Sequence, residues 1–236
     1  MEISKGLEII DAALWLKKEK ILIINDLHLG YEEALHRKGI FVPKFQLEEI
    51  IKNMNSIFKK INPKAIIING DLKHEFGTVL RQEWKEVLKF LDFLLQKKIE
   101  IIIIKGNHDP ILPFIAEKRG IKVVPEFMIQ DTLVVHGDKL AKTKAKRIII
   151  GHEHPAITLR EGSKWEKYKC FLKGKWKRRE LIAVPSFNPL LEGSDILKEQ
   201  LLSPFLQDIK NFQVYIISKG EIFEFGKVKS FKSVSK

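Results

Sequence analysis

Five short apolar runs, each followed at once by a polar turn, constrain the fold of this chain more than any other feature. The runs are rich in β-branched residues and do not alternate between apolar and polar positions, which is typical of strands buried on both faces. They occupy residues 21–24, 65–68, 99–104, 132–135 and 147–150. Two further segments, 47–58 and 84–95, repeat apolar residues at helix spacing. The alternation of strand and helix predicts a layered α/β fold.

The second half of the chain follows a different pattern. It contains successive strand-like segments with little helical sequence between them. These segments are residues 156–160, 168–173, 180–184 and 212–225. We therefore expect a second, partly antiparallel sheet that packs on the first. Because the sequence has no internal repeat and no linker composition, we expect a single domain over residues 1–229, and we expect the polar end, 230–236, to be frayed.

Composition bounds the class of protein. The 236 residues are 44% hydrophobic and 31% charged, as in globular proteins, and they hold no apolar stretch of about 18 residues that would span a bilayer. The single cysteine, Cys170, cannot form an internal disulfide. Charged residues also interrupt the beginning of the chain, where a signal peptide would need an apolar run. We expect a cytoplasmic protein without a membrane partner.

The formal net charge of +12 has two interpretations. It fits attraction to a polyanion such as nucleic acid. It equally fits a lysine-rich proteome, because Lys, Glu and Ile are abundant here, as in many hyperthermophile proteins. The basic stretch 164–179, which also holds four aromatic residues, has two interpretations as well. It is either a hairpin that tracks a phosphate backbone and stacks bases, or a solvated β-ribbon whose aromatic side chains pack on the sheet. We favour the ribbon.

Polar side chains gather in the turns that follow the apolar runs. Six of the seven histidines lie in these turns. The residues concerned are Asp26, His28, Asp71, His74, Asn107, His108, Asp109, His136, His152 and His154. Because open α/β sheets form their ligand crevices at the carboxyl ends of strands, we expect these side chains to meet there.

Imidazole, carboxylate and amide groups without thiolate form a mixed nitrogen and oxygen donor set. Such a set suits Mn, Fe, Zn, Co or Ni ions. In Asp26-x-His28 the paired side chains would point the same way in extended chain, so we expect them to converge on one site. We expect the same of His152-x-His154. A lone Asp-x-His is common, and a lone histidine is more often structural, but five such turns after five strands favour a metal centre.

The order of these blocks resembles the full signature of the calcineurin-like metallophosphoesterase superfamily. The blocks are Asp26-Leu-His28, Gly70-Asp71, Gly106-Asn-His-Asp109, His136 and Gly151-His-Glu-His154. Within the superfamily, the segments 26–31, 70–74 and 151–155 resemble archaeal phosphoesterases related to SbcD and bacterial DNA-ligase-associated phosphoesterases. The resemblance implies a four-layer αββα sandwich of two mixed β-sheets flanked by helices, with a dimetal site at the carboxyl ends of the strands.

The resemblance also implies seven ligands for two divalent ions, with Mn²⁺ favoured and Fe, Zn, Ni or Co as alternatives. The ligands of the first ion would be Asp26, His28 and His154. Those of the second would be Asn107, His136 and His152. Asp71 would bridge the two ions, and a metal-bridging hydroxide would be the nucleophile.

Three further roles follow from the same resemblance. His108 would act as general acid or stabilise developing charge, and Asp109 would orient its imidazole. His74, together with Asn107, would contact the substrate. We expect a phosphodiesterase that acts on a nucleotide or a nucleic-acid end, so nucleic acid is a candidate partner. The alternatives are a phosphomonoesterase or cyclic-nucleotide phosphodiesterase with a small substrate and, from another class, a scaffold without activity. Oligomeric state stays open.

Overall fold

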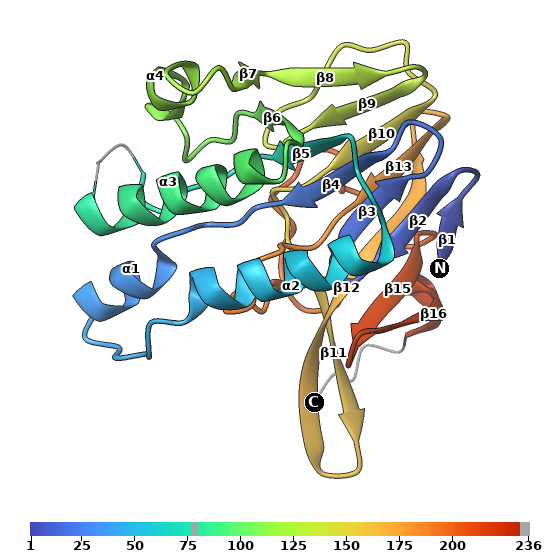
Figure 1. The fold of residues 1–236 in the computed structure, drawn as a ribbon. Helices are drawn as coiled ribbons and strands as arrows, with labels where there is room; N and C mark the ends of the chain where they lie inside the picture. Colours follow the sequence, from blue (N-terminus) through green and yellow to red (C-terminus); the bar gives the residue numbers. More distant parts are fainter. Residues whose placement is uncertain (77–79, 232–236) are drawn as a thin grey trace.

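Two β-sheets lie face to face in the computed structural model, which describes residues 1–76 and 80–231 (Figure 1). Helices in this part of the chain pack on one of the sheets. The expected α/β fold of two mixed sheets flanked by helices is therefore confirmed. The frayed end expected at 230–236 falls mostly on residues 232–236, which lie outside the described residues. Among the residues described, no helix is long and apolar enough to cross a membrane.

The first sheet has an antiparallel half and a parallel half. Its strands follow the chain in the order β1 (Glu2–Ser4), β2 (Leu7–Ile10), β3 (Ala13–Leu16), β4 (Ile21–Asn25), β5 (Ala65–Asn69), β6 (Glu100–Ile104) and β7 (Lys122–Val124). The pairs from β1 to β4 are antiparallel, and those from β4 to β7 are parallel. Three of the five predicted strands are β4, β5 and β6.

The second sheet contains the other two predicted strands and the predicted antiparallel segments. Its main path is β14 (Ser194–Asp195), β11 (Pro155–Glu161), β12 (Lys164–Trp176), β13 (Arg179–Ala183), β10 (Arg147–Ile150), β9 (Thr132–Val135) and β8 (Glu126–Ile129). The strands β9, β10 and β13 run parallel to one another. β15 (Gln213–Ser218) pairs with β12 and with β16 (Glu221–Lys227). The single strand expected over 212–225 is thus a hairpin.

Each isoleucine-rich strand of the first sheet buries both faces, as its lack of alternation predicts. In β4, Ile24 faces the helices, whereas Ile23 packs between the sheets against residues such as Ile149 and Ile182. The side chains of a strand point alternately to opposite faces, so an unbroken apolar run fills two cores at once. This is why the runs carry no polar position until the strand ends.

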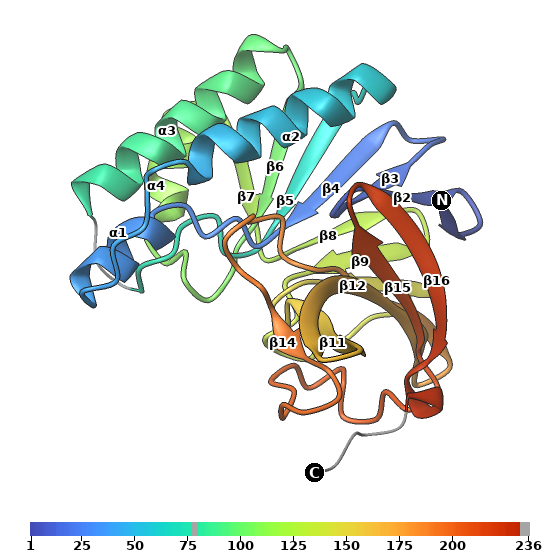
Figure 2. The same cartoon turned by 90° about the horizontal axis from the view of Figure 1, so that it is seen from below.

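The helices α1 (Tyr31–Arg37), α2 (Gln46–Lys60), α3 (Arg81–Gln96) and α4 (Leu112–Glu117) are the α-helices of the described residues. Figure 2 shows α2 and α3 lying across the first sheet, on the side away from the second sheet. The outer face of the second sheet is covered instead by the irregular segment 196–212, through Phe205, Leu206 and Ile209. The fourth layer of the expected αββα order is therefore built from turns rather than helices in the part described.

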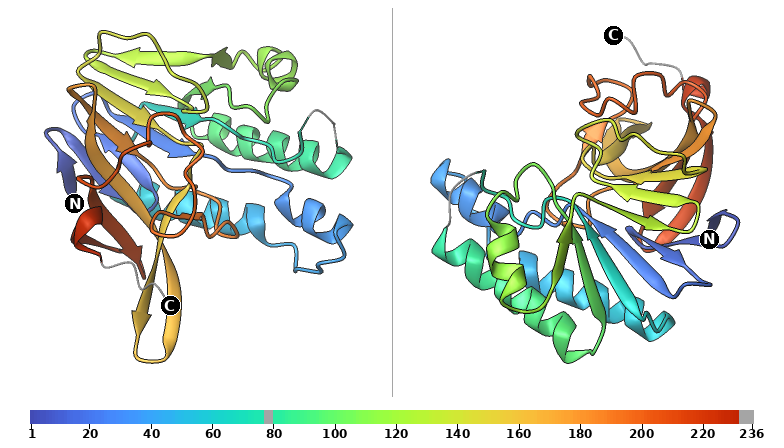
Figure 3. Two further views of the ribbon diagram at one scale, coloured as in Figure 1. Left: turned by 180° about the vertical axis from the view of Figure 1, so that it is seen from behind. Right: turned by 90° about the horizontal axis from the view of Figure 1, so that it is seen from above.

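The basic stretch 164–179 divides into parts with different surroundings. The β11–β12 hairpin extends well beyond the body of the protein (Figures 1 and 3), and Trp165 near its end is 48% exposed. Phe171 is fully buried between the sheets, and Trp176 packs against Phe205 with ring centroids 4.9 Å apart. Most of its aromatic side chains therefore serve the cores.

Candidate metal centre

The expected site residues follow strands of both sheets, and the two sheets bring them to one edge. Asp26 follows β4 of the first sheet, and His136 follows β9 of the second. The Oδ1 atom of Asp26 lies only 3.3 Å from Nδ1 of His136. The carboxyl ends of the parallel strands therefore meet across the gap between the sheets, and the expectation that the turns converge is confirmed.

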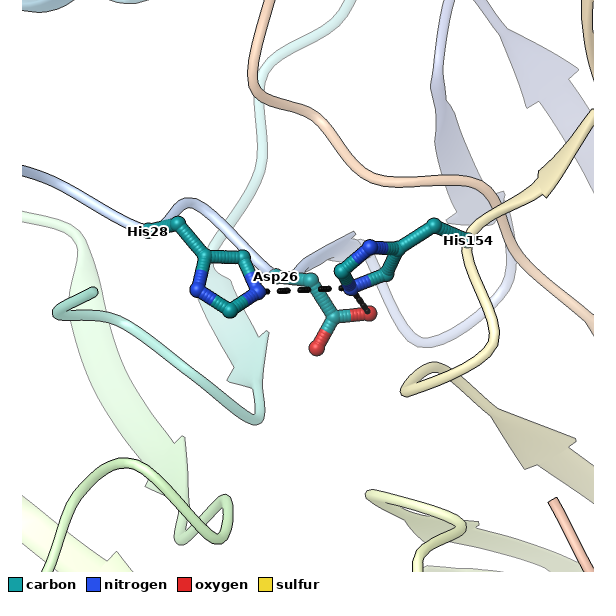
Figure 4. Close-up of side chains that lie close together, drawn as sticks. All are labelled: Asp26, His28 and His154. Atoms are coloured by element: carbon teal, nitrogen blue, oxygen red, sulfur yellow. Dashed lines mark hydrogen bonds and ion pairs between the residues drawn. The ribbon is translucent and has the colours of Figure 1, made fainter. Parts of the chain in front are cut away.

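The first cluster of donor atoms consists of Asp26, His28 and His154, whose ligand atoms all lie within 4.8 Å of one another. Figure 4 shows the two imidazole rings turned toward each other above the carboxylate of Asp26. The Nε2 atoms of His28 and His154 are 3.3 Å apart, and Nε2 of His154 is 3.4 Å from Oδ2 of Asp26.

The second cluster consists of Asp71, His136 and His152, again within 4.8 Å of one another. The Nδ1 atom of His152 is 3.2 Å from Nε2 of His136, which in turn is 3.5 Å from Oδ2 of Asp71. Asn107 joins this cluster, because its Oδ1 atom lies 2.9 Å from Nε2 of His136.

Asp71 connects the two clusters. Its Oδ2 atom is 3.8 Å from Nε2 of His28 in the first cluster and 3.5 Å from Nε2 of His136 in the second. One carboxylate oxygen thus faces imidazole nitrogens from both sides. The seven residues expected to hold metal are therefore brought together in two clusters that share one carboxylate.

The donor atoms of each cluster are placed to bind a cation rather than to hydrogen-bond to one another. In each cluster two imidazole nitrogens approach within 3.3 Å, which brings lone pairs together unless a proton or a cation lies between them. Oδ1 of Asp26 and Nδ1 of His136 are buried and face each other at 3.3 Å, but neither atom has a partner with hydrogen-bond geometry. Buried polar groups are normally satisfied, and unsatisfied ones often mark an ion site. The nitrogen and oxygen donors, without thiolate, suit borderline or hard divalent ions.

The local backbone at four of these residues is left-handed. The φ angles of Asp26, His28, His152 and His154 are 48°, 43°, 65° and 49°. The prediction that each pair converges because the chain is extended was therefore wrong in its reason. It was also wrong in its result for the second pair, because His152 and His154 lie in different clusters. Left-handed conformations of non-glycine residues cost about 1–3 kcal/mol each and concentrate at functional sites.

Two glycines make room for the donor side chains. A Cβ atom at Gly70, whose φ is +80°, would lie 1.8 Å from Nδ1 of His136. A Cβ atom at Gly106 would lie 2.0 Å from Oδ1 of Asp71. Any larger residue would displace a donor, so both turns require glycine for close approach, and the turn at Gly70 requires it for conformation as well.

Burial and charge hold most donors in the form that binds metal. Burial lowers the pKa of His28 well below its usual value, and it also lowers the pKa of His152 and His154. These imidazoles are therefore neutral. Burial also lowers the pKa of His136, but close contact with the negatively charged carboxylates of Asp26 and Asp71 outweighs burial and raises that pKa to about 10. The buried carboxylates thus attract positive charge to the centre of the site.

The three residues expected to act on the substrate lie beside the clusters. Nε2 of His108 is 3.9 Å from Oδ2 of Asp71, and the His108 side chain is 28% exposed. The ring of His74 packs on that of His28 with centroids 5.3 Å apart. Burial lowers the pKa of His74 to about 4, with His108 as the next contributor, so its imidazole is neutral.

The expectation that Asp109 orients the His108 imidazole was wrong. Nδ1 of His108 instead contacts the carbonyl oxygen of His74. Asp109 is fully buried, and its carboxylate accepts hydrogen bonds from three backbone amides, those of Leu72, Lys73 and Gly106. It therefore joins the turns that carry Asp71 and Asn107. Asp109 follows His108 in the sequence, which suggested a contact between them, but the side chain of Asp109 points toward the backbone amides instead.

Two buried polar residues that support the site were missed. Nε2 of Gln46 donates to the carbonyl oxygen of His28 at 2.8 Å. Oε1 of Glu83 accepts from the backbone amides of His74 and Glu75 at 2.9 and 2.7 Å. Each lies in the first turn of a long helix, four positions before a buried apolar residue of the core-facing stripe. A polar residue on the core-facing stripe in the first turn of a helix is the sequence signal that could have identified them.

Comparisons with known proteins agree with this arrangement. The family model of the calcineurin-like phosphoesterases matches residues 19–218. Nuclease MPE of Pseudomonas putida has a similar structure, with a TM-score of 0.67, 18% sequence identity, and coverage of 93% of this chain and 94% of that chain. At this identity the likeness shows the fold.

A second solved structure, the phosphoesterase Yfce from E. coli, aligns with 87% of this chain and 92% of that chain at 13% identity. Its TM-score of 0.39 is too low to support an argument. No curated protein matches the chain. The family match covers most of the sequence and includes all ten expected site residues. The chain therefore belongs to the calcineurin-like phosphoesterase family, whose members bind divalent metal ions, and it is a metallophosphoesterase.

Proposed function

We propose that this protein is a dinuclear metal-dependent phosphodiesterase that hydrolyses a phosphodiester of a nucleotide or of a nucleic-acid end. The observation that carries the proposal is the position of Asp71, whose Oδ2 atom faces His28 of one cluster and His136 of the other. A carboxylate shared by two donor clusters suits a pair of ions, the arrangement many phosphoester hydrolases use. Mn²⁺ is the ion we favour.

When bound, two divalent ions supply an activated water and neutralise the charge of the phosphoryl group. The residues that would hold them are Asp26, His28, Asp71, Asn107, His136, His152 and His154. His108 contributes the proton. Its Nδ1 atom donates to the carbonyl oxygen of His74, which leaves Nε2, on the side of Asp71, to carry a proton to the departing oxygen. His74, beside His28, and Asn107, beside His136, would position the phosphodiester.

Three observations support a nucleotide or nucleic-acid substrate over a generic ester. The net charge of +12 favours polyanions. The fold is similar to that of a nuclease over 93% of this chain. The segments 26–31, 70–74 and 151–155 resemble the SbcD-related and DNA-ligase-associated phosphoesterases.

A metal-by-substrate panel tests the proposal. Apoprotein would be loaded with Mn²⁺, Fe²⁺, Zn²⁺, Ni²⁺ or Co²⁺ and assayed on bis-p-nitrophenyl phosphate, p-nitrophenyl phosphate, a cyclic nucleotide and a short DNA. We expect turnover of the diesters, highest with Mn²⁺, and little of the monoester. Preference for the monoester or the cyclic nucleotide would replace the proposal with a small-substrate esterase, and absence of turnover with two bound ions would favour a scaffold.

A further inference from the structure

A groove of about 470 Å³ opens beside the second cluster. The side chains and backbone that line it include Phe76, Lys105, Asn107, Pro110, Lys139 and Leu140. Because Asn107 also contacts His136, the groove borders the second donor cluster. Its volume falls within the range of about 300–1,000 Å³ that is usual for small-molecule sites.

Phe76 stands where the groove meets the proposed proton donor. Its ring meets the ring of His108 edge-on, with centroids 5.6 Å apart and planes at 88°. His108 in turn stacks near His74, with centroids 5.9 Å apart. Phe76 is nevertheless 64% exposed, although a ring of this size is usually buried. A row of rings thus leads from the donor clusters to an exposed aromatic face at the groove.

The charges in the groove indicate what kind of group fits it. Lys105 and Lys139 are balanced there by Glu126 and Asp138, and Nζ of Lys139 lies 3.8 Å from Oδ2 of Asp138. A groove with balanced charge does not select a second phosphate, which would need an excess of cations.

Apart from Asn107, the remaining lining is apolar and includes Pro110, Pro125, Leu140 and Ala141. An aromatic face, apolar walls and a few polar groups of both signs suit a flat heterocycle with hydrogen-bonding edges. A nucleobase has this chemistry, and bases stack on aromatic side chains with little regard to sequence.

We infer that this groove binds the base of the nucleoside that leaves when the diester is cleaved, and that the base stacks on Phe76. The leaving side is assigned because Phe76, which lines the groove, contacts the ring of His108, the residue that would protonate the leaving oxygen. The inference rests on the proposed phosphodiesterase function and deepens it. It makes the substrate a diester of a nucleoside.

Dinucleotides with single bases removed test the inference. Dithymidine monophosphate would be compared with two analogues that carry an abasic tetrahydrofuran residue on one side or the other, and the products would identify the leaving nucleoside. Wild-type protein should lose at least about fivefold in kcat/KM, mainly through KM, when the leaving base is absent, the low end of what base stacking contributes. Removal of the base from the other nucleoside, which keeps the phosphate after cleavage, should change kcat/KM less than twofold.

Substitutions at Phe76 distinguish base stacking on its ring from a general loss of activity. In Phe76→Ala, the ratio of kcat/KM between dithymidine and its leaving-side abasic analogue should fall to about one. Phe76→Tyr should keep the ratio, because it keeps the ring. Phe223→Ala, which removes another exposed phenylalanine on β16, should behave as wild type. Circular dichroism would confirm that each variant is folded.

The outcomes distinguish this inference from the function on which it rests. Three results would overturn the base site while diester turnover stands. They are a kcat/KM ratio near one between dithymidine and its leaving-side abasic analogue in wild type, a dependence on the base of the nucleoside that keeps the phosphate, and an unchanged ratio in Phe76→Ala. Absence of diester turnover with two bound ions would remove the proposed function, and the base site with it.

Discussion

His152 and His154 are separated by one residue, yet their imidazoles lie in different donor clusters, one beside Asp71 and the other beside Asp26. Both have left-handed backbone, with φ angles of 65° and 49°. Glu153 between them is buried and accepts hydrogen bonds from the amides of Leu202 and Ser203 at 2.7 and 2.8 Å. This short turn therefore spans the whole centre, and a single segment couples the two candidate ion sites.

Asp71→Asn should bind fewer ions than wild type, with the weaker site losing most. The neutral amide offers one oxygen without charge, and the two clusters then share no carboxylate. Elemental analysis after gel filtration would measure the ions bound per chain. Asp131→Asn, at a carboxylate whose side chain is 67% exposed, is the matched control and should keep both ions. Two retained ions and unchanged activity in Asp71→Asn would contradict the bridging role.

His108→Ala should retain both ions while kcat falls by about 10²–10⁴, the usual contribution of a general acid–base group. The structure places His108 beside Asp71 without membership in either donor cluster. Metal content and kcat would be measured on the same preparation. His36→Ala is the control, because His36 contacts the carbonyl oxygen of Val42 away from the clusters. Joint loss of metal and activity in His108→Ala would show that His108 is itself a ligand.

Gly106→Ala should disturb the centre through sterics alone. The added Cβ atom would lie 2.0 Å from Oδ1 of Asp71 and 2.3 Å from its backbone nitrogen, so the turn or the carboxylate must move. We expect loss of bound metal and destabilisation of about 1–3 kcal/mol, typical of overpacking. Metal analysis and urea unfolding would measure both effects. Lys118→Ala on an exposed surface is the control. Normal metal content in Gly106→Ala would mean that the turn has more room than the structure shows.

Stability should rise with pH through the titration of Lys169. Its ammonium donates to the carbonyl oxygens of Ser186 and Asn188 (2.8 Å to Ser186), and Oγ of Ser186 donates to the carbonyl oxygen of Asp26. Burial lowers the pKa of Lys169 from 10.5 to about 8. The unfolded chain binds more protons between these values, so the free energy of unfolding increases as pH rises from 8 toward 10.5.

The measurement compares wild type with Lys169→Met across that range. Their difference in unfolding free energy should shift in favour of wild type by up to about 3 kcal/mol, since one pKa unit corresponds to about 1.4 kcal/mol. Lys175→Met, at an exposed lysine of the same strand, should show no such trend. A flat difference for Lys169→Met would mean that its ammonium stays solvated in the folded protein.

Neutralising the basic residues at the end of β12 should leave oligonucleotide hydrolysis nearly unchanged. The residues are Lys175, Lys177, Arg178 and Arg179. They lie at the amino end of β13, which pairs in parallel with β10, whereas the metal centre follows the carboxyl ends of these strands. Changing all four to Gln should alter the slope of log KM against log salt concentration by less than the change expected from the loss of about one phosphate contact. A markedly flatter slope would place nucleic acid on this edge.

The sequence alone determined the buried strands and the residue types of the centre. The runs in β4, β5, β6, β9 and β10 needed no tertiary information, because a strand covered on both faces must be apolar at every position. The polar turns after them were equally visible, since parallel strands present their following turns at one edge.

Only the tertiary structure decided how those turns divide their donors. Local sequence could not reveal the left-handed backbone at His152 and His154, because residues of these types seldom adopt that conformation. It could not show that Asp109 binds backbone amides rather than His108, because that depends on turns from different strands meeting. Nor could it place Phe76 beside His108, a contact between segments brought together only when the sheet forms.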